Sequence, residues 1–190
     1  MHITANKWST RQLTQVGIFV AVIAICAQIA IPGPGGVPFS LQAWSVALAG
    51  VVLGAKMGFV AALVYGLLGM AGAPVFVGFA GGLQMFMSPT AGFIFSFPLL
   101  AFLAGLGAEK NKGIWLYLGM IMGVGINFMT GVFYFSWITS MSLPVSVGFA
   151  VTPFIVPTLA QIVLVPLFGK TLRSSLSKAG LLVQVDHVPN

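Results

Sequence analysis

Side chains that usually perform acid–base chemistry are nearly absent from this chain of 190 residues, and they avoid its apolar segments. Glu109 and Asp186 are the only acids, and the only histidines, His2 and His187, lie close to the two ends. General acid–base catalysis and metal binding need several such groups at one place, and no spacing in this sequence provides them. The lone Cys26 lies in an apolar segment and has no second cysteine to pair with. We therefore predict that the chain is not an enzyme and uses no metal or cofactor.

The polar groups that could do chemistry are neutral. Asn127 and Gln161 each lie inside a long apolar segment. An unpaired amide buried there would cost about 2–7 kcal/mol, so each should find a partner inside the protein. That partner is either another helix or a bound ligand.

A stretch rich in glycine and phenylalanine, residues 72–93, separates two apolar segments. Gly81-Gly82 and Pro89 would weaken or break a helix. Irregular backbone near membrane depth is tolerated where it is buried in protein or lines a cavity. We therefore predict a ligand site here, with walls from Phe76, Phe79 and Phe93 and hydrogen bonds from Gln84, Ser88 and Thr90. The alternatives are packing or lipid contact for the aromatic side chains and water contact for the polar ones.

Composition determines the elements that must position these side chains. Hydrophobic residues make up 58% of the chain and charged residues 5%, whereas a soluble domain carries roughly 25% charged residues. The apolar runs are continuous and do not alternate as in a membrane β-barrel. We predict an all-α integral membrane protein, with residues 1–190 as a single membrane domain. The expected helices are residues 12–31, 39–55, 57–71, 92–108, 114–137 and 149–169, with a loop at 72–91 and a polar tail at 170–190.

The basic residues predict the orientation of these six segments. All eight Lys and Arg residues fall in residues 1–11, at Lys56, in residues 109–113 or in the tail from Lys170 onward. By the positive-inside rule, both termini then lie inside (N-in, C-in) and the loop at 72–91 lies outside. The net charge of +6 is explained by membrane topology, so nucleic acid is not expected as a partner and the lipid bilayer is.

One pair of small residues predicts contact with another helix. Gly17 and Ala21 are four positions apart in the first apolar segment. Such small-xxx-small pairs let two helices approach closely in a membrane.

Several short motifs follow one another between about residues 15 and 170. They are Phe39-Ser-Leu-Gln42, Leu48-Ala-Gly-Val-Val-Leu-Gly54, Pro74-Val-Phe76, Gly81-Gly82, Pro89-Thr90-x-Gly92 and Pro153-Phe154. In this order they resemble the BioY family, the substrate-binding (S) subunits of energy-coupling factor (ECF) transporters for biotin.

The resemblance implies a six-helix, ECF S-component-like bundle in the plasma membrane of a prokaryote, with the vitamin held near the outer surface. It also implies a transmembrane coupling protein of the EcfT type, which Gly17 and Ala21 would face, and two cytoplasmic ATPases that hydrolyse ATP. Together with the residues already named, Gln42, Thr158 and Tyr134 become candidate substrate contacts.

The sequence departs from the family pattern where charged residues are expected. In place of Pro-Gly-Asp-x-x-Lys the chain reads Val156-Pro-Thr-Leu-Ala-Gln161, so Thr158 and Gln161 replace the charged pair. Ser88-Pro-Thr-Ala-Gly-Phe93 likewise replaces Gly-Pro-Thr-Gly-Gly-Tyr. Biotin is the expected ligand, and lipoate or a biotin-related compound is the alternative. A stand-alone carrier and a membrane scaffold are the other functions left open.

Overall fold

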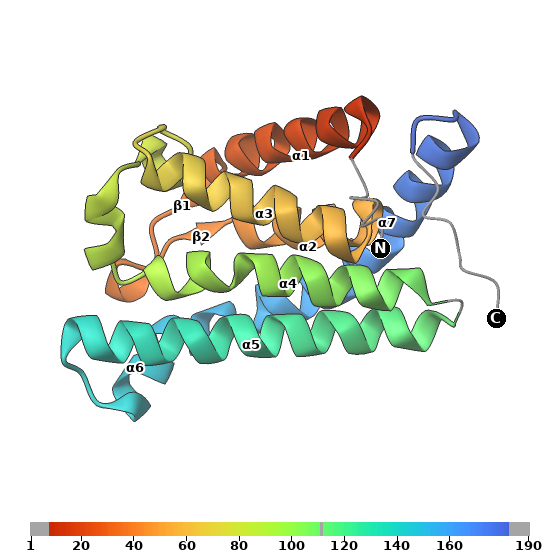
Figure 1. The fold of residues 1–190 in the computed structure, drawn as a ribbon. Helices are drawn as coiled ribbons and strands as arrows, with labels where there is room; N and C mark the ends of the chain where they lie inside the picture. The colour runs from red at the N-terminus through yellow and green to blue at the C-terminus, as the bar shows by residue number, and fades with distance from the viewer. Residues whose placement is uncertain (1–7, 111, 183–190) are drawn as a thin grey trace, which may run out of the picture.

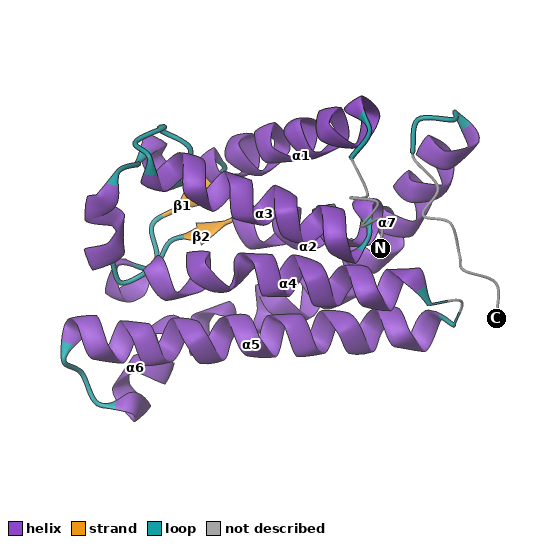
Figure 2. Ribbon diagram, viewed as in Figure 1, coloured by secondary structure: helices purple, strands orange, loops and turns teal. Residues whose placement is uncertain are grey.

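The computed structural model describes residues 8–110 and 112–182 of the chain. Within these ranges the chain is almost entirely helical (Figure 1, Figure 2). The α-helices are α1 (Thr10–Gln28), α2 (Gln42–Leu53), α3 (Ala55–Met70), α4 (Ala91–Glu109), α5 (Gly113–Thr139), α6 (Leu143–Ala150) and α7 (Ile155–Lys178). The strands are β1 (Ala30–Ile31) and β2 (Phe39–Ser40), and the 3-10 helices are η1 (Pro34–Gly36), η2 (Val77–Phe79), η3 (Leu83–Met87) and η4 (Thr152–Phe154). His2, Lys7, Asp186 and His187 lie outside the described residues.

The helices pack as a bundle of six segments, as predicted, because α6, η4 and α7 follow one another as the sixth. In Figure 1, α4 and α5 run side by side along the bundle, with α2 and α3 above them and α1 at the top. α4 contacts α2, α3 and α5, and α7 packs against α2 and α5. α4 therefore forms the centre of the packing.

Several helix boundaries differ from those expected from the sequence. α1 ends at Gln28 and α2 begins at Gln42, because the chain between them forms an antiparallel hairpin in which Ala30 pairs with Ser40. The last apolar segment is interrupted at η4, where Pro153 lacks the N–H that a continuous helix needs. α7 then continues to Lys178, so the first part of the predicted tail is helical.

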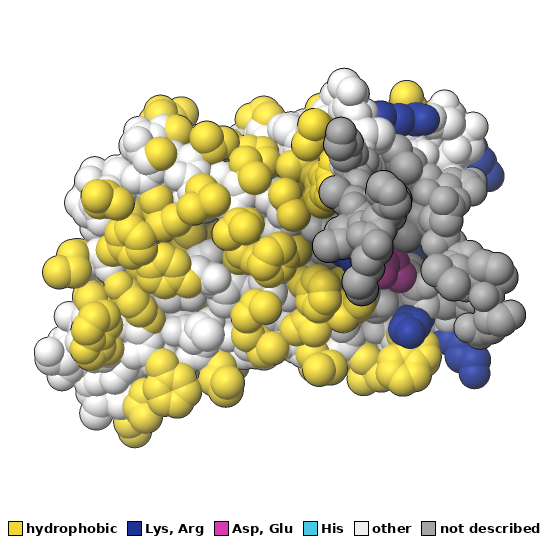
Figure 3. Space-filling model, viewed as in Figure 1, with side chains coloured by type: hydrophobic (Ala, Val, Ile, Leu, Met, Phe, Trp, Pro, Cys, Tyr) yellow, Lys and Arg dark blue, Asp and Glu magenta, His cyan; other side chains and the backbone are white. Residues whose placement is uncertain are grey.

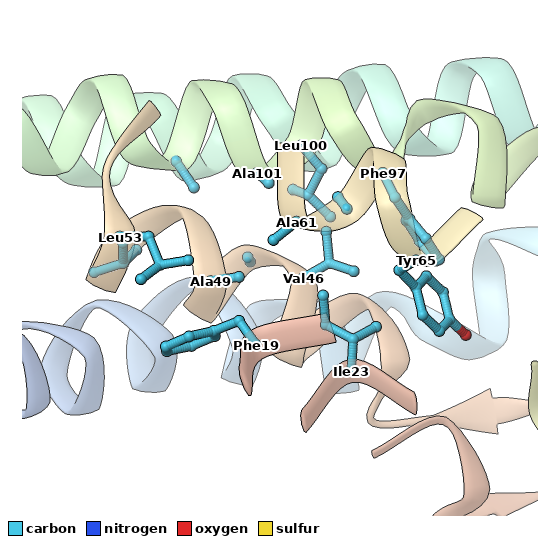
Figure 4. Close-up of a cluster of buried hydrophobic side chains, with 14 of the residues drawn as sticks. Phe19, Ile23, Val46, Ala49, Leu53, Ala61, Tyr65, Phe97, Leu100 and Ala101 are labelled. Carbon is cyan, nitrogen blue, oxygen red and sulfur yellow. The ribbon is translucent and has the colours of Figure 1, made fainter. Parts of the chain in front are cut away.

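Glycines allow the central helices to approach one another at the backbone. A Cβ atom at Gly50 of α2 would overlap the Ala101 carbonyl oxygen of α4, and one at Gly58 of α3 would lie 2.6 Å from the Gly50 Cα. Figure 4 shows the apolar core around this contact, where Val46, Ala61 and Leu100 meet from three helices. Close packing of this kind is what stabilises helix association in lipid.

A single residue, Gly54, joins α2 to α3 and turns the chain back on itself. Its φ of +88° is in the region that favours glycine. The corner is held from two other helices: the Ala55 N–H donates to Glu109 Oε1 at 2.8 Å, and Arg173 donates to the Val51 carbonyl at 3.1 Å. These bonds satisfy backbone groups that helix ends otherwise leave free.

The surface has the character of a membrane protein. α1, α4, α5 and the α6–α7 segment are long and apolar enough to cross a bilayer, and α2 and α3 are shorter apolar helices. Hydrophobic side chains cover most of the face shown in Figure 3, and Lys and Arg side chains gather at one end. That end carries the start of α1, the Gly54 corner, the α4–α5 connection and the end of α7. The positive-inside rule assigns it to the inner side.

We expect Glu109→Leu to destabilise the protein by about 1–3 kcal/mol, because the buried corner then loses the acceptor for the Ala55 N–H. Glu109→Gln keeps an acceptor oxygen and should lose less. Thermal unfolding of the purified protein in detergent measures both, with Lys110→Ala at the neighbouring exposed position as the control. Equal stability of Glu109→Leu and Lys110→Ala would contradict this role.

Candidate functional site

A cavity of about 770 Å³ lies in the half of the bundle opposite the basic end. Its walls come from the end of α1, the β1–β2 hairpin, the start of α2, the 76–90 loop, α4, α5 and the α6–α7 segment. The exposed Ile31 and Leu41 are among its lining residues, so the cavity reaches the surface at the hairpin. Most of the wall is apolar, with aromatic rings from Phe39, Trp44, Phe76, Phe93, Phe97, Phe128 and Phe154.

The structure brings together seven of the eleven residues predicted to bind substrate. Those that line the cavity are Gln42, Phe76, Thr90, Phe93, Asn127, Thr158 and Gln161. The other four, Phe79, Gln84, Ser88 and Tyr134, are not among the lining residues. Contact of any of the eleven with substrate stays a prediction.

Gln28, at the last turn of α1, fixes the loop that carries Phe76. Its amide nitrogen donates to the carbonyl oxygens of Val75 and Phe76, at 3.4 and 3.0 Å. Its amide oxygen accepts the Phe79 N–H at 2.9 Å. One side chain therefore satisfies three backbone groups of the loop and joins it to α1.

Tyr65 and Gln42 fix the same loop from α3 and α2. The Tyr65 hydroxyl donates to the Val75 carbonyl at 2.9 Å and accepts a hydrogen bond from Gln42 Nε2 at 2.7 Å. Gln42 is 6% exposed and Tyr65 is fully buried. This chain of bonds places the Gln42 side chain at the cavity wall in one orientation.

Asn127 and Gln161 lie on α5 and α7, 6% and 4% exposed. Asn127 Nδ2 donates to the Phe93 carbonyl at 2.9 Å and to Ser96 Oγ at 2.8 Å, which ties α5 to α4. Gln161 Nε2 donates to the Ala43 carbonyl at 3.2 Å, which ties α7 to α2. Each amide therefore has a helix partner and also lines the cavity.

Aromatic pairs complete the walls. Phe39 of the hairpin stacks on Phe154 of η4 with ring centroids 4.3 Å apart. The Phe93 and Phe128 rings meet edge to face at 6.2 Å. Phe76 is 1% exposed, and its ring lies against Gly69 of α3, where a Cβ would overlap it. Glycine at position 69 is thus required for the Phe76 ring to occupy its place.

The four predicted residues outside the cavity have other contacts. Phe79 is 70% exposed and has a φ of +57°, and Gln84 is exposed and donates to the Gly81 carbonyl. The Ser88 hydroxyl bonds to the Thr90 hydroxyl at 2.8 Å, and Tyr134 donates to the Phe86 carbonyl. Three of them, Gln84, Ser88 and Tyr134, hold the loop between residues 81 and 90 through these bonds.

Sequence reasoning missed several lining residues. Gln28 carried a usable signal, because it is a glutamine at the end of an apolar segment and had to find a partner. Trp44, Phe97 and Phe128 carried none, since aromatic side chains in an apolar helix face lipid, core or cavity without any difference in pattern.

The lining residues in the part of the chain described are neutral, without a charged side chain or an imidazole. Concave, mostly apolar sites with a few placed polar groups are typical of small-molecule binding. The fold and cavity therefore define a helical membrane protein with a small-molecule binding site.

The chain belongs to the BioY family, whose model matches residues 3–178. It is 42% identical over 165 residues to the biotin transporter BioY of Thermotoga maritima, covering 86% of this chain and 96% of that protein. It is 38% identical over 151 residues to the probable biotin transporter BioY of Pyrococcus horikoshii, covering 80% and 89%. The fold is similar to the crystal structure of an S-component for biotin from an ECF-type ABC transporter, with a TM-score of 0.76 and 23% identity over 88% of this chain and 95% of that one.

We expect Gly69→Ala to displace the Phe76 ring and loosen the 75–82 loop, because the new methyl group occupies the space of the ring. Hydrogen exchange of the loop amides should become faster, notably at Phe76 and Gly82, which donate to Ala80 and Gly69 carbonyls.

Gly66→Ala is the matched control, since a Cβ there meets nothing within 4 Å. Equal exchange rates in the two variants would show that the ring does not depend on Gly69.

Proposed function

We propose that this chain is the biotin-binding S subunit of an ECF-type uptake transporter. The observation that carries the proposal is the cavity, which combines aromatic walls with buried neutral amides from three helices. Biotin combines an apolar thioether ring and an aliphatic chain with a hydrogen-bonding ureido group, which suits an apolar wall that carries a few polar groups. The names of the relatives in Thermotoga and Pyrococcus support the same ligand.

The location of the cavity supports uptake from outside. It lies in the half of the bundle away from all the described Lys and Arg residues, hence in the outer half by the positive-inside rule. We place the protein in the plasma membrane of a prokaryote, as a multi-pass protein.

Turnover requires partners in this proposal. A transmembrane coupling protein and two cytoplasmic ATPases would supply the energy. Gly17 and Ala21 are exposed on α1, and a Cβ at Gly17 meets nothing within 4 Å. This face of α1 is where we place the coupling protein.

Isothermal titration of the purified protein with biotin tests the ligand. We expect binding, and we expect Phe93→Ala to weaken it at least roughly tenfold, because about 1.5–3 kcal/mol of apolar contact is removed. Phe95→Ala is the control, two residues along α4 and 43% exposed outside the cavity.

The other outcomes are equally informative. If titration with biotin releases no heat and titration with lipoate does, lipoate would replace biotin as the proposed ligand. Biotin uptake by liposomes that contain this chain alone would favour the stand-alone carrier.

We expect Gly17→Leu to reduce co-purification with the coupling protein, because close helix approach no longer fits a branched side chain. Gly125→Leu on α5 is the control, since Gly125 is also exposed and free of neighbours within 4 Å. Biotin binding should be unchanged in both variants. Equal recovery of the complex from both would exclude Gly17 from the contact.

A further inference from the structure

Three buried amide side chains of the cavity share one orientation. Gln42, Asn127 and Gln161 each direct the NH₂ group into the protein, toward Tyr65, Phe93 and Ala43 respectively. In the described part of the chain, no hydrogen bond is made to the amide oxygen of any of the three. The cavity is therefore lined by carbonyl acceptors from three different helices.

Chemistry fixes this orientation. The partners of Asn127 and Gln161 are backbone carbonyl oxygens, which can only accept, so the amide nitrogen must face them. The Tyr65 hydroxyl uses its proton on the Val75 carbonyl, so it can only accept from Gln42. If any of these amide groups were turned by about 180°, its oxygen would face a partner oxygen that has no hydrogen to donate to it.

The three oxygens open into the cavity. Among the described residues, Gln15 Oε1 is the one side-chain polar atom that is fully enclosed and without a partner. The oxygens of Gln42, Asn127 and Gln161 are thus accessible, although the residues are only 4–6% exposed. All three residues line the cavity, so the cavity is the space that these oxygens face.

Side-chain donors in the described wall are uncharged. Besides the amide NH₂ groups, they are the hydroxyls of Ser40, Thr90 and Thr158 and the indole N–H of Trp44. No Lys, Arg or His side chain is among the lining residues of the described chain. An ionised carboxylate taken into such a wall loses its hydration without a cation to replace it.

We propose that the cavity selects its ligand through N–H donors, and that the ligand's carboxylate is not recognised. This rests on the proposed function: the ureido N–H groups of biotin would meet the amide oxygens of Gln42, Asn127 and Gln161. A ligand without N–H groups leaves these acceptors unpaired, which disfavours it. Biotin carboxamides, in which the acid is converted to a neutral amide, are then substrates of the same class as biotin.

Isothermal titration with biotin, biotinamide and biotin methylated on a ureido nitrogen tests the selection. We expect biotin and biotinamide to bind within about threefold of each other, a difference smaller than a charge-assisted hydrogen bond provides. Methylation should weaken binding at least roughly tenfold, because a donor is lost and the methyl group faces an oxygen. Lipoate, which has the carboxylate but no N–H, should bind more weakly than biotinamide.

Failure of the inference and failure of the proposed function give different results. If biotin binds and biotinamide is weaker by tenfold or more, the inference is wrong and the function stands. If neither compound binds, the proposed function itself is wrong. Equal binding of biotin and its methylated analogue would overturn the role of the acceptors.

Thr158→Lys, one turn before Gln161 on α7, supplies the missing cation at the cavity wall and leaves the three amide oxygens in place. We expect it to raise the preference for biotin over biotinamide at least roughly tenfold, because a charge-assisted hydrogen bond to the carboxylate is worth at least that factor. Thr158→Arg provides a second variant if the first does not fold. Gln15→Leu is the control, a buried glutamine of α1 outside the cavity that should leave the preference unchanged. An unchanged preference in a folded lysine variant would contradict the proposal.

Discussion

A polar group inside a helical bundle in lipid must find its hydrogen-bond partners within the protein, because the surrounding hydrocarbon offers none. In this chain the NH₂ groups of three amide side chains meet that requirement through backbone carbonyls of neighbouring segments. Gln28 binds the 75–79 loop, Asn127 binds α4 and Gln161 binds α2. These bonds join elements that are far apart in sequence, and they surround one space. The amides therefore fix segments that form the walls of the cavity.

The way the backbone packs at each end of the bundle explains why the cavity lies at one end. At the inner end, glycines let α2, α3 and α4 touch at the backbone. α2 begins only at Gln42, and the β1–β2 hairpin occupies the outer half beside it. In this half the hairpin and the 71–90 loop contribute irregular backbone in place of closely packed helix pairs. Aromatic rings such as Phe76 and Phe154 then form the wall.

Much of the fold could be predicted from the sequence, because apolar length and the positions of basic residues are one-dimensional properties. The six segments and the inner position of the charged end follow from them. Helix ends at Gln28 and Gln42 could not be placed, since the pairing of Ala30 with Ser40 depends on contact between two segments that both read as apolar. The extension of α7 to Lys178 has a similar cause, since a polar sequence can remain helical.

The site was less predictable, for reasons that particular residues show. Phe76 and Phe79 are three positions apart in one loop, yet positive φ values at Gly78 and Phe79 turn the second ring to the surface. Asn127 and Tyr134 lie two turns apart on one face of α5, but only the first is level with the cavity. Irregular backbone and height along a helix are set by tertiary contacts, so composition and spacing could not separate these pairs.

On α7 the basic residues lie far from the cavity, and this limits where a charged group of a ligand can be placed. Gln161 lines the cavity, and the nearest cation on the same helix, Lys170, is nine residues further, roughly 14 Å along the axis. That distance is too great for a hydrogen-bonded ion pair. A carboxylate on a ligand must then keep its water, which is available where the exposed Ile31 and Leu41 border the cavity. In the proposed binding mode, the neutral head of the ligand would point inward to the amide oxygens and its tail to the hairpin.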